Sequence, residues 1–242
     1  PPPHPGIRGG TKKPKNPIRI EGFPGFGLIG TIATEYLIEH LDCELIGRYW
    51  FEDLPATIAI HEGKMVNPVG IFYNKKNNIV IIHSIAGATG VEWKAADFVF
   101  DIAKTLDVKE IISLEGVGST TLNEDTNVFY HINKEQKRNK IEKMEIKPLK
   151  EGIIMGITSA LMVIIREKIP MTCFFAETHT SLPDSKAAAK VIEVLDKYLG
   201  LNVDYKPLLK QAEKFEDKLR KLMEQGATAK KQQDRKSLSY VG

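Results

Sequence analysis

A glycine-rich turn between a short apolar strand and an amphipathic helix places the strongest constraint on how this chain can fold. Residues 18–20 are typical of a strand, and residues 28–41 carry apolar side chains at helical spacing. Between them, Gly25, Gly27 and Gly30 match the G-x-G-x-x-G pattern of dinucleotide-binding turns. The segment therefore predicts an α/β fold, and the first question is whether the turn binds a nucleotide.

The residues within and after the turn argue against a nucleotide site. Glu44 and Glu52 do lie at the spacing at which such folds place an acid for the ribose. Pro24, however, removes an N–H from the turn, and Phe23 and Phe26 add bulk where a pyrophosphate would lie. We interpret the turn as a strand-to-helix junction whose glycines allow unusual φ angles and close packing, with nucleotide binding as an alternative. The glycines in this structural role are Gly22, Gly25, Gly27 and Gly30.

Composition predicts a cytoplasmic protein without a bound metal or cofactor. With 242 residues, 42% of them hydrophobic, the chain can bury a full core. No secretory signal is visible, and no apolar run reaches the roughly 18 to 20 residues of a membrane span, so we expect no membrane partner. Cys43 and Cys173 lie far apart, which predicts free thiols. His40, His61 and His131 share no metal-ligand spacing.

Charge is concentrated at the two ends of the chain. Residues 1–20 hold five basic and no acidic side chains, and residues 226–242 hold four basic and one acidic. Since the whole chain has a net charge of +3, the part between these ends carries −5. A negative body binds nucleic acid poorly, and we expect no nucleic-acid partner.

Four segments are expected along the chain: a disordered stretch at residues 1–17, an α/β core at 18–205, a helix at 206–225, and a flexible basic tail at 226–242. Strands are predicted at residues 18–20, 44–51, 57–61, 68–73, 79–85, 110–114 and 171–176, and helices at 28–41, 93–106, 152–166 and 185–199. A hairpin loop is predicted at residues 74–78, and the polar stretch 123–147 predicts a mobile excursion. The order of elements predicts a mixed sheet with helices on both faces.

The helix predicted at residues 206–225 has a narrow apolar seam on an otherwise charged surface. Its apolar residues recur at intervals of three and four, over about two heptads. The helix either docks on its own domain or packs against a neighbouring subunit, and residues 152–166 are a second candidate for subunit contacts. The residues assigned to the oligomer contact are Leu208, Phe215, Leu219 and Leu222.

Glycine-rich loops also follow other predicted strands, at residues 86–90, 115–119 and 177–183. If these strands run parallel, the loops meet at one sheet edge, where open α/β folds bind ligands. Glu115, Glu177 and His179 would then supply carboxylates and a base. The nearby hydroxyl groups are those of Ser119, Thr120 and Ser181. This arrangement gives a competing hypothesis, a hydrolase or phosphorylase-like enzyme, although no G-x-S-x-G elbow is present.

Four motifs in order resemble the proteasome-assembly-chaperone family in its archaeal branch. They are GFPGFGLIGTIATEYL at residues 22–37, LEGVG at 114–118, GIIMG at 152–156, where the family begins a helix, and LPDSKAAA at 182–189. The resemblance spans roughly residues 18–205. It implies a phosphorylase/hydrolase-like fold, a three-layer α/β/α sandwich with a mixed sheet, which agrees with the predicted order of elements.

The resemblance also implies a function: a non-enzymatic assembly chaperone that binds proteasome α-subunits or a paralogous chaperone. Such proteins work as oligomers. The resemblance therefore implies a ring-like homo-oligomer for this chain, with a tetramer and a pentamer as the two options. Some end in a hydrophobic-Tyr-any tail that inserts between α-subunits, and this chain offers Leu238, Tyr240 and Val241 as tail residues. The match is displaced by one position, because Tyr240 is third from the end and Ser239 precedes it.

Overall fold

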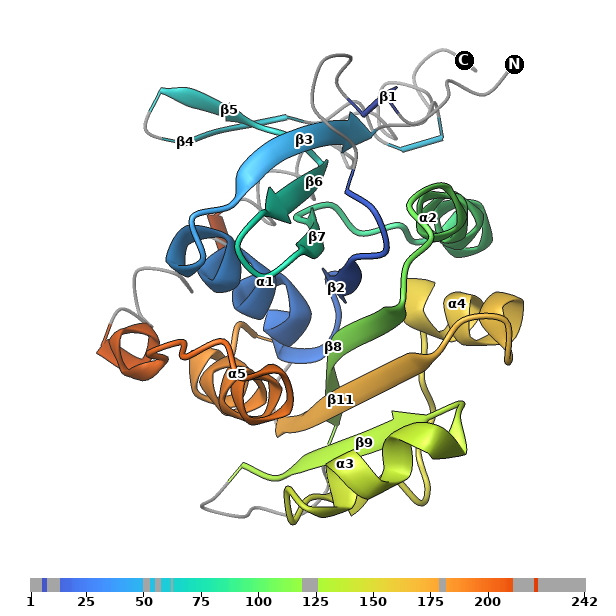
Figure 1. Ribbon diagram of the computed structural model, residues 1–242. Coiled ribbons are helices and arrows are strands. Elements are labelled where there is room, and N and C mark those ends of the chain that lie inside the picture. Colours follow the sequence, from blue (N-terminus) through green and yellow to red (C-terminus); the bar gives the residue numbers. More distant parts are fainter. Residues whose placement is uncertain are drawn as a thin grey trace, which may run out of the picture.

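One mixed sheet organises the part of the chain that the computed structural model describes, which is residues 6–7, 14–49, 53–54, 58–61, 63–118, 126–178, 182–210 and 220–221. Its strands are β1 (Gly6–Ile7), β2 (Ile18–Gly22), β3 (Glu44–Tyr49), β6 (Val69–Asn74), β7 (Ile79–Ser84), β8 (Glu110–Gly118), β9 (Val128–Ile132), β10 (Lys147–Pro148) and β11 (Met171–Thr178). Their order across the sheet is β1-β3-β6-β7-β2-β8-β11-β9-β10 (Figure 1). A separate hairpin pairs β4 (Ala59–His61) with β5 (Lys64–Val66).

The four central strands, β7, β2, β8 and β11, run parallel to one another. Ile18 in β2 lies beside Ile79 in β7 and Glu110 in β8, so the strands begin at one edge of the sheet and end together at the other. We call the edge where they end the carboxyl edge. The pairs β3–β6, β6–β7 and β9–β11 are antiparallel, including the β6–β7 hairpin around the predicted loop, whereas β10 pairs with β9 in parallel. The condition for gathering the glycine-rich loops at one edge is therefore met.

Helices cover both faces of the sheet, as Figure 1 shows. The helices are α1 (Ile29–His40), α2 (Glu92–Thr105), α3 (Arg138–Glu142), α4 (Ile157–Ile165) and α5 (Ser185–Leu199). On one face Ile20, Ile112 and Phe174 pack in a cluster with α1 and α5, whereas Ile111 and Phe175 pack with α2 and α4 on the other. Strands buried on both faces are apolar at successive positions, which is why these runs were recognisable. The predicted three-layer α/β/α sandwich is confirmed.

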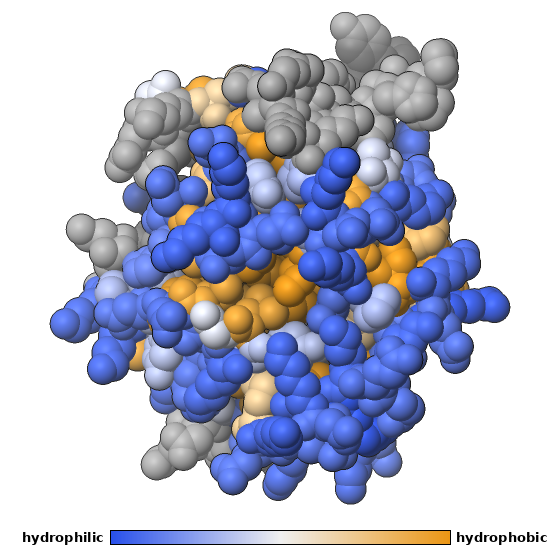
Figure 2. All heavy atoms as spheres, viewed as in Figure 1, coloured by the Kyte–Doolittle hydropathy of each residue, from blue (hydrophilic) through white to orange (hydrophobic). Residues whose placement is uncertain are grey.

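Figure 2 shows hydrophilic residues over most of one face of the molecule, with hydrophobic residues visible between them near its centre. Within the described residues, no helix is both long enough and apolar enough to cross a bilayer.

Two predicted segments differ from the structure. The polar stretch 123–147, predicted as an excursion, contains β9 and α3 and reaches β10. Its strand lies near the sheet margin, so Val128 and Tyr130 are buried while His131 is exposed, and α3 buries Ile141. The helix predicted from residue 152 begins only at Ile157, because Gly156 has φ 84° and ψ −159°, outside the helical region. Residues 152–156 are therefore not helical.

The ends of the predicted core also shift. Ordered contacts begin before residue 18: the Asn16 N–H donates to the Leu106 carbonyl at 3.1 Å, and the Lys109 N–H donates to the Pro17 carbonyl at 3.0 Å. Leu208, assigned to an oligomer contact, is wholly buried in the cluster around α1 and α5, so its side chain is unavailable to a neighbouring subunit. The remaining residues of that assignment and of the tail, Phe215, Leu219, Leu222, Leu238, Tyr240 and Val241, lie outside the described residues.

Backbone-to-backbone contact fixes α1 against the sheet. A Cβ atom on Gly22 would lie 2.0 Å from the Gly30 carbonyl oxygen, and one on Gly30 would lie 2.3 Å from the Leu114 carbonyl oxygen. Gly27 has φ 61°, in the left-handed region that glycine adopts without strain. Gly25 has neither a close backbone contact nor a left-handed conformation: a Cβ atom there would meet no atom closer than 3.4 Å, and its backbone is extended with φ −157°. Three of the four glycines therefore have the predicted structural geometry.

We expect Gly30→Ala to destabilise the fold by at least about 2 kcal/mol, because the added methyl group overlaps backbone that cannot move aside cheaply. Chemical denaturation of the full chain measures the change. Gly87→Ala is the matched control, because a Cβ at Gly87 meets nothing within 4 Å and the position is exposed. Equal stabilities of the two variants would contradict a close junction.

Candidate functional site

Large apolar side chains are exposed around the carboxyl edge. Each lies just before or at the start of a helix, and they are Phe26, Trp93, Ile153, Met155 and Leu182. Ile153 is 83% exposed and Met155 is 65% exposed, because the glycine-bounded segment before α4 is not helical and leaves them outside the core. A concentration of exposed apolar residues at one edge is typical of a protein-binding surface.

A hollow of about 370 Å³ opens at this edge, and we call it the edge pocket. The turn after β2, the start of α2, the end of β8 and the segment before α4 all contribute to it. Its lining residues are Pro24, Gly25, Phe26, Thr89, Glu92, Glu115, Gly116, Ile153, Ile154, Met155 and Gly156. The pocket therefore combines the glycine-rich turn with two of the other resembling motifs.

Glu115 is the buried acid of the edge pocket. Its side chain is 8% exposed, and the Thr158 hydroxyl in α4 donates a hydrogen bond to its Oε1. Burial raises the pKa of the Glu115 carboxyl to about 8, and the charge of Glu21 adds to this, against the hydrogen bonds from Thr158 and Ser113. The carboxyl is therefore mostly protonated at neutral pH.

A buried ion pair lies deeper on the same face of the sheet. Arg19 Nη2 lies 2.8 Å from Glu21 Oε2, with both side chains wholly buried, and Arg19 Nη1 donates to the Val99 carbonyl in α2. Burial lowers the pKa of Arg19 and raises that of Glu21, and their mutual attraction opposes both changes. Since a guanidinium stays protonated in proteins, we describe the pair as ionised. The sequence analysis did not predict this ion pair. Arg19 and Glu21 stand at alternate positions of a strand covered on both faces, and this spacing indicates two charges buried on the same face.

The two carboxylates of the enzyme hypothesis, Glu115 and Glu177, lie in different hollows. Glu177 lines a different hollow, of about 580 Å³, and its Oε2 accepts a hydrogen bond from Asn127 Nδ2 at 2.7 Å. Glu115 and Glu177 therefore belong to separate hollows. His179, Ser119, Thr120 and Ser181 lie outside the described residues.

The geometry also opposes nucleotide binding. The first residues of α1, Ile29, Gly30 and Thr31, are buried, so the N-terminus of the helix has no open surface for a pyrophosphate. Glu44 begins β3, whose start aligns with the starts of the central strands, at the edge opposite the glycine turn. Glu52 lies outside the described residues, and those that are described contain no group of ligands able to hold a metal ion.

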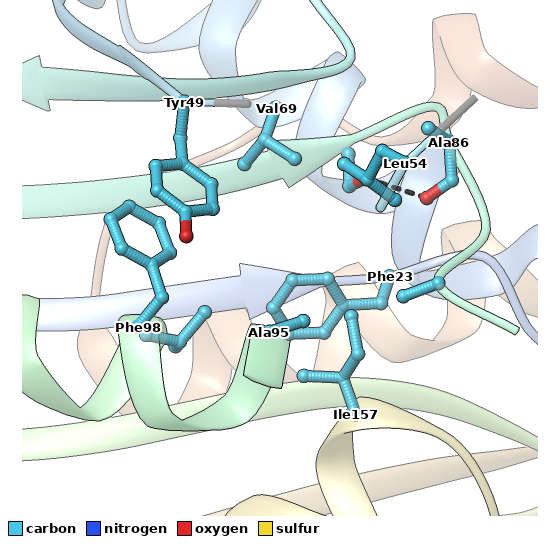
Figure 3. Close-up of a pocket in the computed structure, with 11 residues that line it drawn as sticks. Phe23, Tyr49, Leu54, Val69, Ala86, Ala95, Phe98 and Ile157 are labelled. Carbon is cyan, nitrogen blue, oxygen red and sulfur yellow. Dashed lines mark hydrogen bonds between the residues drawn. The ribbon is translucent and has the colours of Figure 1, made fainter. Parts of the chain in front are cut away.

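A second, apolar cavity lies between the sheet and α2. Figure 3 shows Phe23, Tyr49, Phe98 and Ile157 around it, with the rings of Tyr49 and Phe98 stacked. Its volume of about 20 Å³ is no more than a water molecule needs. Phe23, predicted to add bulk within the turn, points into this core region instead, and the cavity is a packing defect without room for a ligand.

The fold is a three-layer α/β/α sandwich with exposed apolar side chains around its carboxyl edge. Residues 19–223 match the PAC2 family, and the chain belongs to that family. The crystal structure of Pyrococcus furiosus PbaA, described as an archaeal homologue of proteasome-assembly chaperone, is 34% identical with a TM-score of 0.79, covering 90% of this chain and 97% of PbaA. The family predicted from the four motifs is confirmed.

Two more distant relatives match most of the chain, one by structure and one by sequence. Pyrococcus furiosus PbaB, described as an archaeal proteasome activator, is 21% identical with a TM-score of 0.74, covering 88% of this chain and 96% of PbaB. An uncharacterised protein of Methanocaldococcus jannaschii is 29% identical over 212 residues, 87% of each chain.

Glu115→Gln tests the buried acid through the pH dependence of stability. The folded protein retains the Glu115 proton up to about pH 8, whereas the unfolded chain loses it near the ordinary pKa of the group. This contribution to stability is therefore present at low pH and is lost as the pH rises. We expect the stability of the variant relative to the wild type to increase by up to about 1.4 kcal/mol per pH unit between pH 5 and 8.

Chemical denaturation across this pH range measures the difference. Glu177→Gln, at a half-buried residue of the same edge, is the control for replacing a carboxyl by an amide there. Parallel stability curves for the wild type and Glu115→Gln would contradict a raised pKa.

Proposed function

We propose that this protein is a cytoplasmic proteasome-assembly chaperone that acts without catalysing a reaction. The observation that carries the proposal is the relationship to PbaA, which extends over nearly the whole of both chains at 34% identity. The partner is a proteasome α-subunit or a paralogous chaperone, and the protein works as a ring-like homo-oligomer, a tetramer or pentamer.

The carboxyl edge supports this proposal as the surface that meets a partner. Phe26, Ile153 and Met155 surround the edge pocket and are exposed, so a protein placed there would bury apolar area from several loops at once. Residues on loops held by a rigid sheet are well suited to binding, because their positions are fixed while their side chains stay accessible.

The C-terminal tail is the second contact in the proposal. The residues between 226 and 237 supply a basic linker, and Leu238, Tyr240 and Val241 supply the apolar group that enters a pocket between α-subunits. About 16 residues reach at most roughly 50 Å, far enough to extend from one body to a neighbouring ring. Several tails on one oligomer add avidity without tight individual binding.

Deleting residues 237–242 should weaken binding to a ring of α-subunits at least about tenfold, because the tail contributes through avidity. Surface plasmon resonance with recombinant α-subunit rings of the same organism measures the affinity of the full oligomer. Ser237→Ala is the control, since it changes the linker and leaves the apolar group intact. An unchanged affinity after the deletion would exclude the tail as a contact.

Replacing the exposed apolar residues of the edge tests the surface independently of the tail. We expect the double variant Ile153→Ser and Met155→Ser to lose partner binding by at least about tenfold, because both side chains would be desolvated in the complex. Val163→Ser is the control, since it also replaces an exposed apolar side chain by serine: Val163 is 52% exposed and lies on α4, outside the lining of the edge pocket. Equal losses from the edge and α4 variants would argue against the edge as the partner surface.

A further inference from the structure

The polar groups that line the edge pocket indicate the kind of ligand it can bind. Two carboxyl groups, those of Glu115 and Glu92, line it, and none of the described residues in its lining has a basic side chain. Thr158 satisfies Oε1 of Glu115, whereas Oε2 faces Gly25, where a Cβ atom would lie 3.4 Å from it. Ser113 also hydrogen-bonds the carboxyl, and the side of Oε2 that faces Gly25 is open to the pocket.

We propose that the edge pocket receives a lysine or arginine side chain from a segment of a partner protein, with its cationic group on Glu115. The inference rests on the proposed function, since it takes the carboxyl edge as the partner surface. A buried carboxyl whose partners are neutral hydroxyl groups gains most from a charged donor, because hydrogen bonds between ionised groups are the stronger kind.

The remaining walls suit the stem of such a side chain. Pro24, Phe26 and Met155 give apolar contact for the methylene groups, which lysine and arginine bury while their charged ends reach polar atoms. Phe26 also offers an aromatic face for a cation. Gly25 leaves the path to Oε2 open, because it has no side chain to cover it.

The exposed rim identifies the ligand as part of a protein. Phe26, Ile153 and Met155 are exposed around the pocket, and a small free amine inside it would leave them in water. A side chain carried on an apolar segment would cover them while it fills the pocket, which gives the polar centre and apolar surround of a protein interface.

Binding of a cation transfers a proton to solvent. The Glu115 carboxyl loses its O–H proton to water or buffer, and the resulting carboxylate pairs with the ammonium or guanidinium group. The charged and titratable groups around Glu115 are Glu21 on β2, which is paired with Arg19, Cys173 on β11 and Glu92 on α2; among described residues, α4 contributes the Thr158 hydroxyl. Apart from Arg19, which is paired with Glu21, none is a base, so none competes with the incoming cation.

Calorimetry with short peptides tests the ligand class on the full chain. The probes are acetylated and amidated Leu-Xaa-Leu tripeptides with lysine, norleucine or glutamate at the centre. We expect the lysine peptide to bind at least about tenfold more tightly than the norleucine peptide, and to release close to one proton at pH 7, measured in buffers of different ionisation enthalpy.

The affinity for the lysine peptide should rise as the pH increases from 6 to 8, because the wild type must first lose the Glu115 proton. Glu115→Gln should lose both the lysine preference and this pH dependence. Gly25→Val should block binding without changing a charge, since its extended backbone accepts a side chain that would cover Oε2. Glu177→Gln, in the neighbouring hollow, should bind like the wild type.

Equal binding of the lysine and norleucine peptides, preference for glutamate, or no lysine-dependent binding at about 10 mM peptide would each overturn the proposal. A parallel assay against α-subunit rings separates the two levels of the argument. If the wild type binds rings and Glu115→Gln binds equally, the pocket assignment fails and the proposed function stands. If the wild type does not bind rings, the proposed function fails and the peptides alone decide the ligand class.

Discussion

The contact of the α1 backbone with the backbones of β2 and β8 is the constraint on which the rest of the structure depends. Gly22 and Gly30 let the chain pass within distances that any side chain would prevent. Because α1 is held at its first turn, the loop before it is held as well, and Gly25 and Phe26 take fixed positions at the carboxyl edge. The motif that suggested a nucleotide site thus builds a wall of a different pocket.

Polar groups buried on one face of the sheet give that edge its chemistry. The ionised pair of Arg19 and Glu21 lies deepest, and Glu115 lies where the sheet opens to the surface. The deeper acid has a guanidinium partner, whereas the outer acid has, among the described residues, only the hydroxyl groups of Thr158 and Ser113 as partners. The same strand geometry therefore places one carboxylate in a structural role and leaves the next one available to a ligand.

The sequence was informative where apolar patterning decides the outcome, and less so where single backbone angles do. The central strands and the helices α1, α2 and α5 were predictable because their faces are buried. The position of Gly156 in a conformation closed to helices was not predictable from spacing, and it exposes Ile153 and Met155. Glu115 was identified as a candidate, but its separation from Glu177 depends on which loops enclose each hollow, which no local pattern encodes.

The short strand β10 has a consequence for how copies of this protein can associate. It lies at the margin of the sheet and consists of Lys147 and Pro148. Proline offers no N–H to an incoming strand, and an exposed lysine charge would be brought against the added chain. The sheet is thereby closed to extension at this margin. An oligomer of this protein would have to be joined there by side chains and not by a continuous intermolecular sheet.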